Sequence, residues 1–206
     1  MNTDELGRAF ARAREGDQHA FATLWRTLQP SLLRYLRVVV GDAAPDVASE
    51  TWLQAARDVH GFRGDGTAFR VWLFRVARHR AIDELRRAGR RPEEPRDLDG
   101  FDGPTVRFTA PDAALEALDR LDTDWALAVI GTLPRDQAEA VMLRVVAGLD
   151  VAQTANVLGK RAGAVRIAAM RGLRRLATHV EVQARRPDAT GGRLAVGREA
   201  PRPEGV

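Results

Sequence analysis

The sequence predicts an all-α protein built of two small helical domains joined by a flexible acidic linker. Ala, Leu and Arg dominate the chain, and no stretch sustains the period-two alternation that strands require. Residues 89–112 contain four Pro, three Gly and much of the acidic charge, which is typical of a solvated linker. Apolar residues recur at helical spacing on both sides of this stretch, so each side predicts its own small core.

The N-terminal domain begins with two predicted helices, over residues 4–15 and 17–40. Asp17 is a suitable N-cap, because its carboxylate can accept hydrogen bonds from the free amides of the first turn. Pro30 predicts a break or a new first turn, since proline lacks the amide hydrogen that a helix interior uses. Gly41 predicts the end of the second helix.

Two further helices are predicted over residues 46–59 and about 68–88, with a glycine-broken loop at 61–67 between them. The first of them has an apolar face that can line a core, made of Val47, Thr51, Trp52, Ala55, Ala56 and Val59. Its remaining face is left outside and consists of Asp46, Ser49, Glu50, Leu53, Gln54 and Arg57.

The C-terminal domain has four predicted helices, over residues 113–132, 135–147, 150–158 and 163–178. Gly148 and Gly159 separate the last three, and Asp150 caps the third. The sequence therefore predicts a first domain over residues 1–90, a linker over 91–112, a second domain over 113–180 and a disordered tail over 181–206.

Charge is segregated along the chain, although the formal net charge is only +4. Residues 63–91 carry nine Arg and residues 160–186 carry eight Arg or Lys, whereas residues 92–124 carry ten acidic residues. Two basic blocks of this kind favour binding of a polyanion, and solvated helix faces are the plain alternative for either block alone. The excess of Arg over a single Lys suits phosphate and guanine contacts, or reflects a GC-rich genome.

Several classes of protein are excluded by what the sequence lacks. It has no cysteine, so disulfides, thiolate catalysis and sulfur-ligated zinc are absent. Its four His are scattered, and no phosphate loop or paired inward carboxylates stand out, so we expect no metal, no cofactor and no enzyme active site. No apolar run approaches the ~20 residues of a membrane helix and no signal-peptide core is present, so we expect a cytoplasmic protein without membrane insertion.

The three helices from residue 135 to 178 have the arrangement of a DNA-binding helix-turn-helix. The last helix would enter the major groove, where basic side chains reach phosphates and base edges. The available cations are Lys160, Arg161, Arg166, Arg171, Arg174 and Arg175. The plain alternative is a structural three-helix bundle with a solvated basic face.

The helix at 68–88 interleaves aromatic and basic residues. Aromatic faces can stack on unpaired bases while Arg binds the backbone, so this pattern suits melted DNA better than duplex. Aromatic and aliphatic residues at helical spacing, such as Trp72 and Leu73, are more often core. Phe62 and Phe69 flank the loop and are the less certain cases.

Together these stretches resemble the bacterial sigma-70 family, in particular its small extracytoplasmic-function (ECF) group. The resemblance covers residues about 15–90 (region 2) and about 113–178 (region 4), and it rests on Asp46-Val47-Ala48-Ser49-Glu50-Thr51-Trp52-Leu53-Gln54-Ala55, on the Arg-aromatic helix and on Leu133-Pro134 through Arg171. It implies a non-enzymatic factor that directs core RNA polymerase to promoters, reads their −10 and −35 elements and melts the −10 element. An autonomous helix-turn-helix regulator is the alternative, and a nucleic-acid-processing enzyme is the remote one.

The resemblance also implies roles for individual residues. The core polymerase would be bound, through its β′ clamp helices, by Asp46, Ser49, Glu50, Leu53 and Gln54. The −10 element would be bound by Phe62, Arg63, Phe69, Arg75, Arg78, His79, Arg80, Arg86 and Arg87. The −35 element would be bound by the six cations of the helix-turn-helix, and the other partners would be the polymerase β flap and an anti-sigma factor.

The chain departs from the family pattern at some of these positions. His79 stands where the family usually has Asn, which predicts altered −10 contact. Ser49 replaces a common Gln, and Ala168 replaces an Arg, which predicts altered −35 reading.

Overall fold

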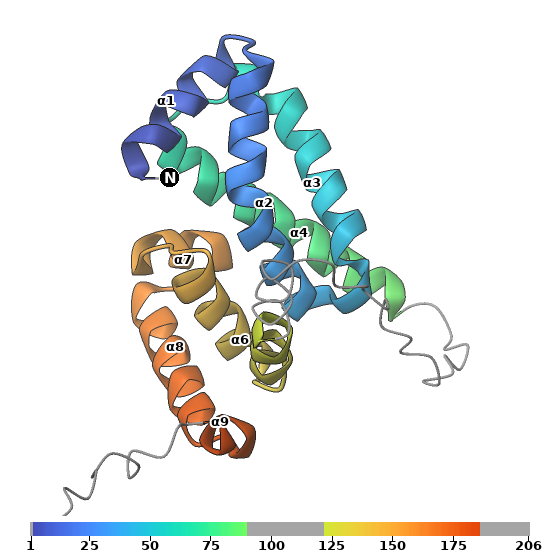
Figure 1. Cartoon of the computed structure of the whole chain (residues 1–206), viewed down its shortest axis with the longest axis vertical. Helices are drawn as coiled ribbons and strands as arrows, with labels where there is room; N and C mark the ends of the chain where they lie inside the picture. The colour runs from blue at the N-terminus through green and yellow to red at the C-terminus, as the bar shows by residue number, and fades with distance from the viewer. Residues whose placement is uncertain (1, 90–121, 186–206) are drawn as a thin grey trace, which may run out of the picture.

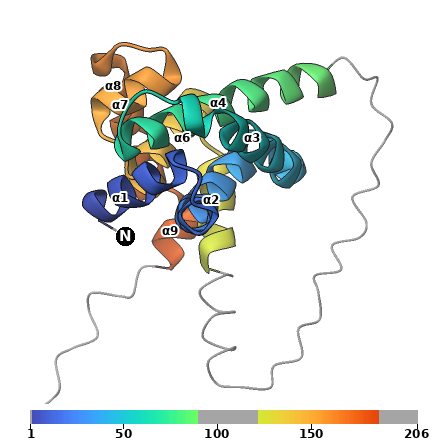
Figure 2. The ribbon, with the colours of Figure 1, turned by 90° about the horizontal axis from the view of Figure 1, so that it is seen from above.

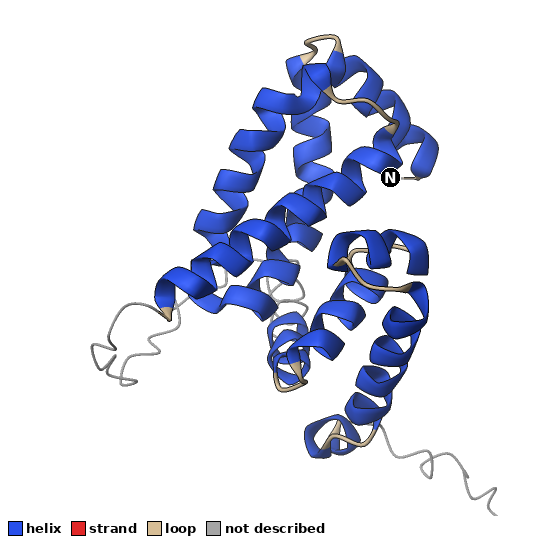
Figure 3. Cartoon of the chain, turned by 180° about the vertical axis from the view of Figure 1, so that it is seen from behind, coloured by secondary structure: helices blue, strands red, loops and turns tan. Residues whose placement is uncertain are grey.

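The computed structural model describes residues 2–89 and 122–185, and every regular element in these residues is helical (Figure 3). This confirms the all-α prediction for the described part of the chain. The linker predicted at 91–112, the first residues of the helix predicted at 113–132 and the tail after 185 lie outside the described residues.

The N-terminal bundle consists of four helices, α1 (Thr3–Arg14), α2 (Gln18–Val40), α3 (Ala44–Asp58) and α4 (Gly66–Ala88). Two short 3₁₀ turns, η1 (Gly41–Ala43) and η2 (Val59–Gly61), join α2 to α3 and lead out of α3. Helix α2 packs against α1 and α3, while α4 packs against α1, α2 and α3, so the four helices enclose one core (Figure 1).

Local signals explain how the first two helices begin. The Asn2 side chain accepts from the Glu5 amide at 2.8 Å while Glu5 accepts from the Asn2 amide at 3.0 Å, which forms a capping box. Asp17 caps α2 as predicted, accepting from the amides of His19 and Ala20 at 2.9 and 3.0 Å. These amides and the Arg12 guanidinium hold the pKa of the Asp17 carboxyl below its usual value.

The prediction of a break or new turn at Pro30 is wrong, because α2 runs through it to Val40. Pro30 lies on the exposed side of the helix, where water can bind the carbonyl that loses its amide partner. The opposite side is fixed by buried leucines at positions 24, 28, 32 and 36, and their packing outweighs the lost hydrogen bond.

The C-terminal unit, residues 122–185, begins with a helix over residues 122–131. It continues with α6 (Arg135–Val141), the π-helical turn η3 (Met142–Val146), α7 (Val151–Leu158), α8 (Ala162–Ala177) and α9 (Val180–Ala184). The helix predicted over 135–147 therefore ends in a π turn, in which the Ala147 amide donates to the Met142 carbonyl at 2.9 Å.

Helix α9 corrects the prediction that disorder begins at residue 181. It is held against the helix over residues 122–131, where Trp125 Nε1 donates to Glu181 at 3.0 Å. The Arg185 guanidinium lies 4.2 Å from the Trp125 ring centre and pairs with Asp122 at 2.7 Å. Both contacts join segments far apart in sequence, so the composition of the tail could not predict them.

Close packing of α6 against α8 depends on Gly172. A Cβ atom at this position would lie 2.8 Å from Val141 Cγ2, closer than packed carbon atoms approach. Val141 also belongs, with Leu133 and Ala138, to a small apolar cluster within the C-terminal unit.

The two units share one hydrophobic core. Helix α7 packs on α4, and α6 and η3 pack on α2. The buried side chains of Leu143 and Val157 belong to the same apolar cluster as Phe74 and Leu36 of the N-terminal bundle. Figure 1 shows the C-terminal unit directly beneath the bundle, with α7 nearest to it.

Candidate nucleic-acid interface

The outer face of α3 has the composition of a docking surface. Asp46, Ser49, Glu50 and Leu53 are exposed as predicted, and Gln54 is half-buried. Leu53 is 58% exposed and leaves an apolar side chain on an otherwise polar face. Ala56, expected in the core, is exposed as well. An apolar side chain flanked by carboxylates suits a partner that is both apolar and basic.

Arg80 of α4 links the α3 face to the basic helix. Its guanidinium pairs with Glu50 at 2.7 Å and donates to the Gln54 side-chain oxygen at 3.0 Å. Its Nε is buried and has no partner among the described residues. Arg80 is therefore only partly available to DNA in this conformation, which sequence reasoning did not foresee.

The aromatic residues around the start of α4 form a cluster. Phe62 packs edge-on against Phe10 and Phe69 with ring centres 5.6 Å apart, and Trp72 completes the group. Phe69 is 0% exposed, so its assignment to the −10 surface is wrong in this structure; it is core. Phe62 is half-buried and keeps part of its ring at the surface.

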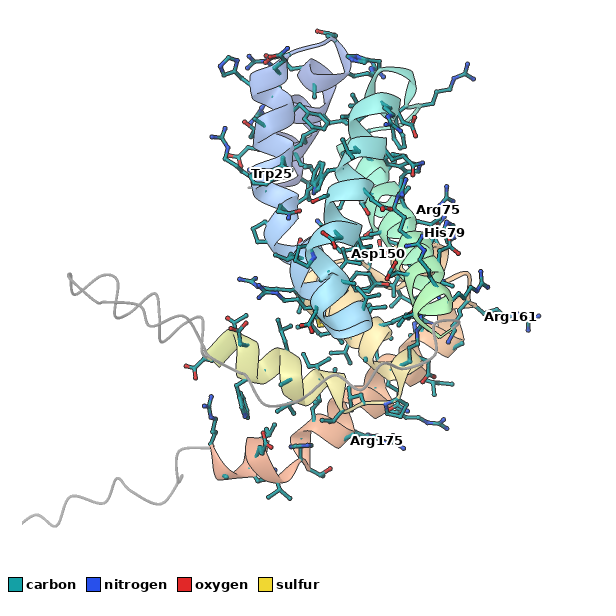
Figure 4. The ribbon with its side chains drawn as sticks, turned by 90° about the vertical axis from the view of Figure 1, so that its right-hand side faces the viewer. Trp25, Arg75, His79, Asp150, Arg161 and Arg175 are labelled. Atoms are coloured by element: carbon teal, nitrogen blue, oxygen red, sulfur yellow. The ribbon has the colours of Figure 1, made fainter. Side chains whose placement is uncertain are left out.

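Four arginines and one histidine of the residues assigned to the −10 element are exposed. Figure 4 shows Arg75 and His79 extending from the same stretch of α4, with Trp25 on the opposite side of the bundle. The C-terminal end of α4 projects beyond α3 (Figure 2). The exposed residues are Arg63, Arg75, His79, Arg86 and Arg87.

Arg78, by contrast, turns toward the C-terminal unit. Its Nε pairs with Glu139 of α6 at 2.9 Å, and Arg135 Nε pairs with the other oxygen of the same carboxylate at 2.9 Å. Arg70 donates to the Ala147 carbonyl, and burial lowers the pKa of its guanidinium. No pattern in the sequence predicts the contacts of Glu139, Arg135 or Arg70, because they depend on how the two units pack.

Two hollows lie along the seam between α4 and α7. One, of about 470 Å³, is lined by Arg75, Arg78 and His79 of α4 and by residues 156–159 of the facing unit. The second, of about 600 Å³, is lined by Phe62 and Arg63 of the loop before α4, by residues of the first turns of α4, and by Ala152, Gln153 and Asn156 of α7. Much of the predicted −10 surface therefore faces the C-terminal unit.

Helices α7 and α8 form the predicted helix-turn-helix. Asp150 caps α7 through a capping box with Gln153, whose amide donates to it at 2.8 Å. Gly159 ends α7 with φ 63°, the left-handed conformation that allows the chain to turn sharply into α8. This turn places the start of α8 at the surface, as Arg161 shows in Figure 4.

The exposed face of α8 and its preceding turn is strongly basic. None of its six cations has an ion-pair partner in the part of the chain that the structure describes, and α8 contains no acid. Ala168 is 7% exposed, so the departure at this position falls on the buried side of α8, away from the exposed basic face. The six cations are Lys160, Arg161, Arg166, Arg171, Arg174 and Arg175.

Within residues 2–89 and 122–185 no cluster of His, Asp or Glu could hold a metal ion. No helix in these ranges is both long and apolar enough to cross a bilayer.

Comparison with known proteins agrees with this geometry. The sequence matches the Sigma-70 region 2 family over residues 24–91 and the Sigma-70 region 4 family over residues 123–176. The first match covers α3 and α4, and the second covers the helix-turn-helix.

Full-length relatives and a solved structure agree as well. The chain is 32% identical to ECF RNA polymerase sigma factor SigD of Mycobacterium tuberculosis, over 85% of this chain and 84% of that protein. It is 33% identical to ECF RNA polymerase sigma factor ShbA of Streptomyces griseus, over 85% and 97%. The structure of CnrH in complex with the cytosolic domain of CnrY has the same fold, with a TM-score of 0.58 at 22% identity over 90% of this chain and all of that one. The chain therefore belongs to the sigma-70 family, as a factor of ECF type that acts with RNA polymerase in promoter-specific initiation of transcription.

Proposed function

We propose that the three surfaces described above divide the work of a sigma factor between them. The α3 face binds the core polymerase, the exposed cations of α4 bind the opened −10 strand, and α8 reads the −35 duplex. The observation that carries the proposal is the charge of these surfaces. The α3 face presents Asp46, Glu50 and Leu53, whereas every charged residue of α8 is an arginine, beside the exposed apolar side chains of Ile167, Met170 and Leu173.

The α3 face fits the β′ clamp helices of the polymerase. Leu53 supplies an exposed apolar side chain, and Asp46 and Glu50 supply charge that suits a basic partner. A central apolar residue with polar surroundings is the usual composition of a binding hot spot.

The −10 surface that we propose is smaller than the sequence suggested. Phe62, Arg63, Arg75 and His79 remain, and so do Arg86 and Arg87, which are exposed although they pair with Asp83 and Glu84 of the same helix. Phe69 is core, and Arg78 and Arg80 pair with acidic side chains of other helices. A neutral imidazole both donates and accepts hydrogen bonds, though from opposite edges, so His79 can replace an amide only with a changed geometry. We expect a shifted −10 base preference as the result.

The −35 surface that we propose is α8. Its cations neutralise phosphates, and any that reaches a guanine edge discriminates between bases by about 1–3 kcal/mol. The same unit would contact the polymerase β flap, and an anti-sigma factor would restrain the chain by covering these faces. Since it works with the polymerase, the protein acts in the cytoplasm, and it contributes no catalytic group of its own.

The test is selection of promoter sequences from a random duplex library with the purified chain, with and without core polymerase. We expect salt-dependent, weak binding by the chain alone, and enrichment of a two-part motif followed by transcription only when polymerase is added. Nanomolar binding of one site by the chain alone would identify an autonomous helix-turn-helix regulator instead. A variant with Leu53→Asp serves as the control, because it should lose polymerase-dependent enrichment while keeping the salt-dependent background.

A further inference from the structure

The segment between α3 and α4, residues 60–66, is fixed to α1 at three points. Helix α1 lies outside the residues that match region 2, which are 24–91, and it packs against η2 and the first turns of α4 (Figure 1). The three contacts are a hydrogen bond, a pair of aromatic rings and a close approach of two backbones. Each of them places a different part of the segment, so α1 helps to decide its shape.

The first contact is made by His60. Its ring is exposed, and Nδ1 lies 3.0 Å from the carbonyl oxygen of Arg14 at the end of α1. Because a carbonyl oxygen can only accept, Nδ1 carries the hydrogen and donates it. The last carbonyls of a helix have no amide partner within that helix, so this bond satisfies one of them. It joins the beginning of the segment to the C-terminal end of α1.

The second contact fixes the ring of Phe62. Phe10 of α1 is 2% exposed, and its ring centre lies 5.6 Å from that of Phe62 at an interplanar angle of 85°, an edge-to-face arrangement. Phe62 also meets Phe69 at 5.6 Å and Trp72 at 5.5 Å. Rings from both α1 and α4 thus pack against Phe62, and its orientation depends on both helices.

The third contact is the approach of α1 to Gly66, the first residue of α4. A Cβ atom at this position would lie 2.8 Å from the Leu6 carbonyl oxygen and 3.0 Å from the Gly7 Cα. Both atoms belong to the backbone of α1, which cannot turn aside as a flexible side chain can. Gly66 does not have a positive φ, so close packing and not conformation requires glycine here. The backbone of α1 therefore fixes the point at which α4 begins.

Phe62 and Trp72 also line a hollow of about 420 Å³ at the surface of the bundle. Arg57 and Arg63 contribute to the same hollow. Aromatic faces stack on unpaired bases, and guanidinium groups bind the phosphate of the same strand. The position of Phe62 therefore decides the shape of a hollow that suits one unpaired base with its phosphate.

We infer that α1 is a positioning element for recognition of the −10 strand, in which Phe10 and His60 set the place of Phe62 and thereby the base that is accepted. The inference rests on the proposed role of Phe62 and Arg63 at that strand. Phe10 is buried and acts only through the ring that it touches, so it is not itself a DNA contact. A shift of Phe62 alters how a base stacks, whereas the charge of the surface stays the same. Base preference is therefore the quantity that responds.

The experiment measures base preference on single strands. The chain bound to core polymerase selects from a library of random single-stranded oligonucleotides, with core polymerase alone as the background. The enrichment of one base over the others at each position is the base preference, and no duplex has to be opened. Phe10→Leu keeps an apolar side chain and removes the ring. We expect it to lower the preference about two- to tenfold, as for loss of part of one base–aromatic stacking contact.

Two further sets of variants test the other contacts. Gly66→Ala and Gly7→Ala each add one methyl group where α1 crosses α4, but only the first meets the Leu6 carbonyl, since a Cβ atom on Gly7 has nothing within 4 Å. We expect Gly66→Ala alone to lower the preference. His60→Ala should lower it as well, and His60→Asn should restore it, because an amide nitrogen can donate to the Arg14 carbonyl. The preference compares oligonucleotides bound by one sample, so a smaller folded fraction does not change it.

The double variant Phe10→Leu with Phe62→Leu shows whether one residue acts through the other. We expect it to have the same base preference as Phe62→Leu alone, because coupled residues are not additive. Additive losses, or equal effects of Gly66→Ala and Gly7→Ala, would overturn the positioning role of α1. So would an unchanged preference in Phe10→Leu when Phe62→Leu lowers it, although Phe62 would then still read the −10 strand. An unchanged preference in Phe62→Leu itself would instead overturn the proposed −10 role of Phe62, and the inference with it.

Discussion

Replacing Leu53 by Ala should weaken binding of the chain to core RNA polymerase without weakening its fold. The Leu53 side chain is 58% exposed, so more than half of its apolar surface is available for burial by a partner. Full burial of a leucine contributes about 1.5–3 kcal/mol, and the exposed share therefore corresponds to about 1–1.7 kcal/mol, or a five- to twentyfold higher dissociation constant. The free energy of unfolding should change by less than about 0.5 kcal/mol, as for other surface substitutions.

The assay is fluorescence anisotropy of the labelled chain titrated with core polymerase, run alongside chemical denaturation of each variant. Leu24→Ala is the matched control, because Leu24 on α2 is 0% exposed and its truncation should cost about 2–5 kcal/mol of stability. Unchanged affinity in the Leu53 variant would refute the docking role of α3. A large loss of stability there would show that this face packs against the protein itself.

Substitutions at four further residues test other parts of the molecule. Arg166→Ala and Arg171→Ala should each lower the slope of log affinity against log salt by about 0.9 if the side chain contacts phosphate. The slope is measured by filter binding of DNA to the polymerase-bound chain. An unchanged slope together with an unchanged base preference would show that the residue does not contact DNA. Phe69→Ala should cost about 3–5 kcal/mol of unfolding free energy by denaturant titration, because the ring is buried against Phe10 and Trp72; near-wild-type stability with a loss of −10 binding would restore the stacking role. Asp150→Ala should lower the free energy of unfolding by about 1 kcal/mol, and with it the melting temperature, because α7 loses its N-cap. Asp150→Asn should keep most of this stability, since an asparagine side chain can also cap a helix. Equal melting temperatures of the two variants would argue against the cap.

Local signals made much of the fold predictable from the sequence. Asp17, Asp150 and Gly159 act through atoms within a few residues of themselves, and all three cap or end helices where the sequence places them. The outward face of α3 was predictable for the same reason, because helical spacing alone decides which side chains share a face.

Features that depend on distant partners were not predictable. Pro30 is tolerated because of where α2 lies in the bundle, and Phe69 is core because α1 brings Phe10 against it. Glu139 looked like any acid of an amphipathic helix, and its burial follows from the packing of α6 against α2 and the approach of Arg78. No pattern within one segment contains that information.

Arg80 belongs to α4, which we propose binds DNA, and its hydrogen bonds connect it to the α3 face. Glu50 and Gln54 hold this guanidinium at rest, so a ligand that occupies Glu50 releases a cation on α4, and a nucleic acid that draws Arg80 away leaves Glu50 free. Binding at two faces that share a residue is thermodynamically linked, and the linkage has equal size in both directions. With this linkage, polymerase binding would raise the affinity of the chain for melted DNA. Binding of melted DNA would raise its affinity for polymerase by the same factor.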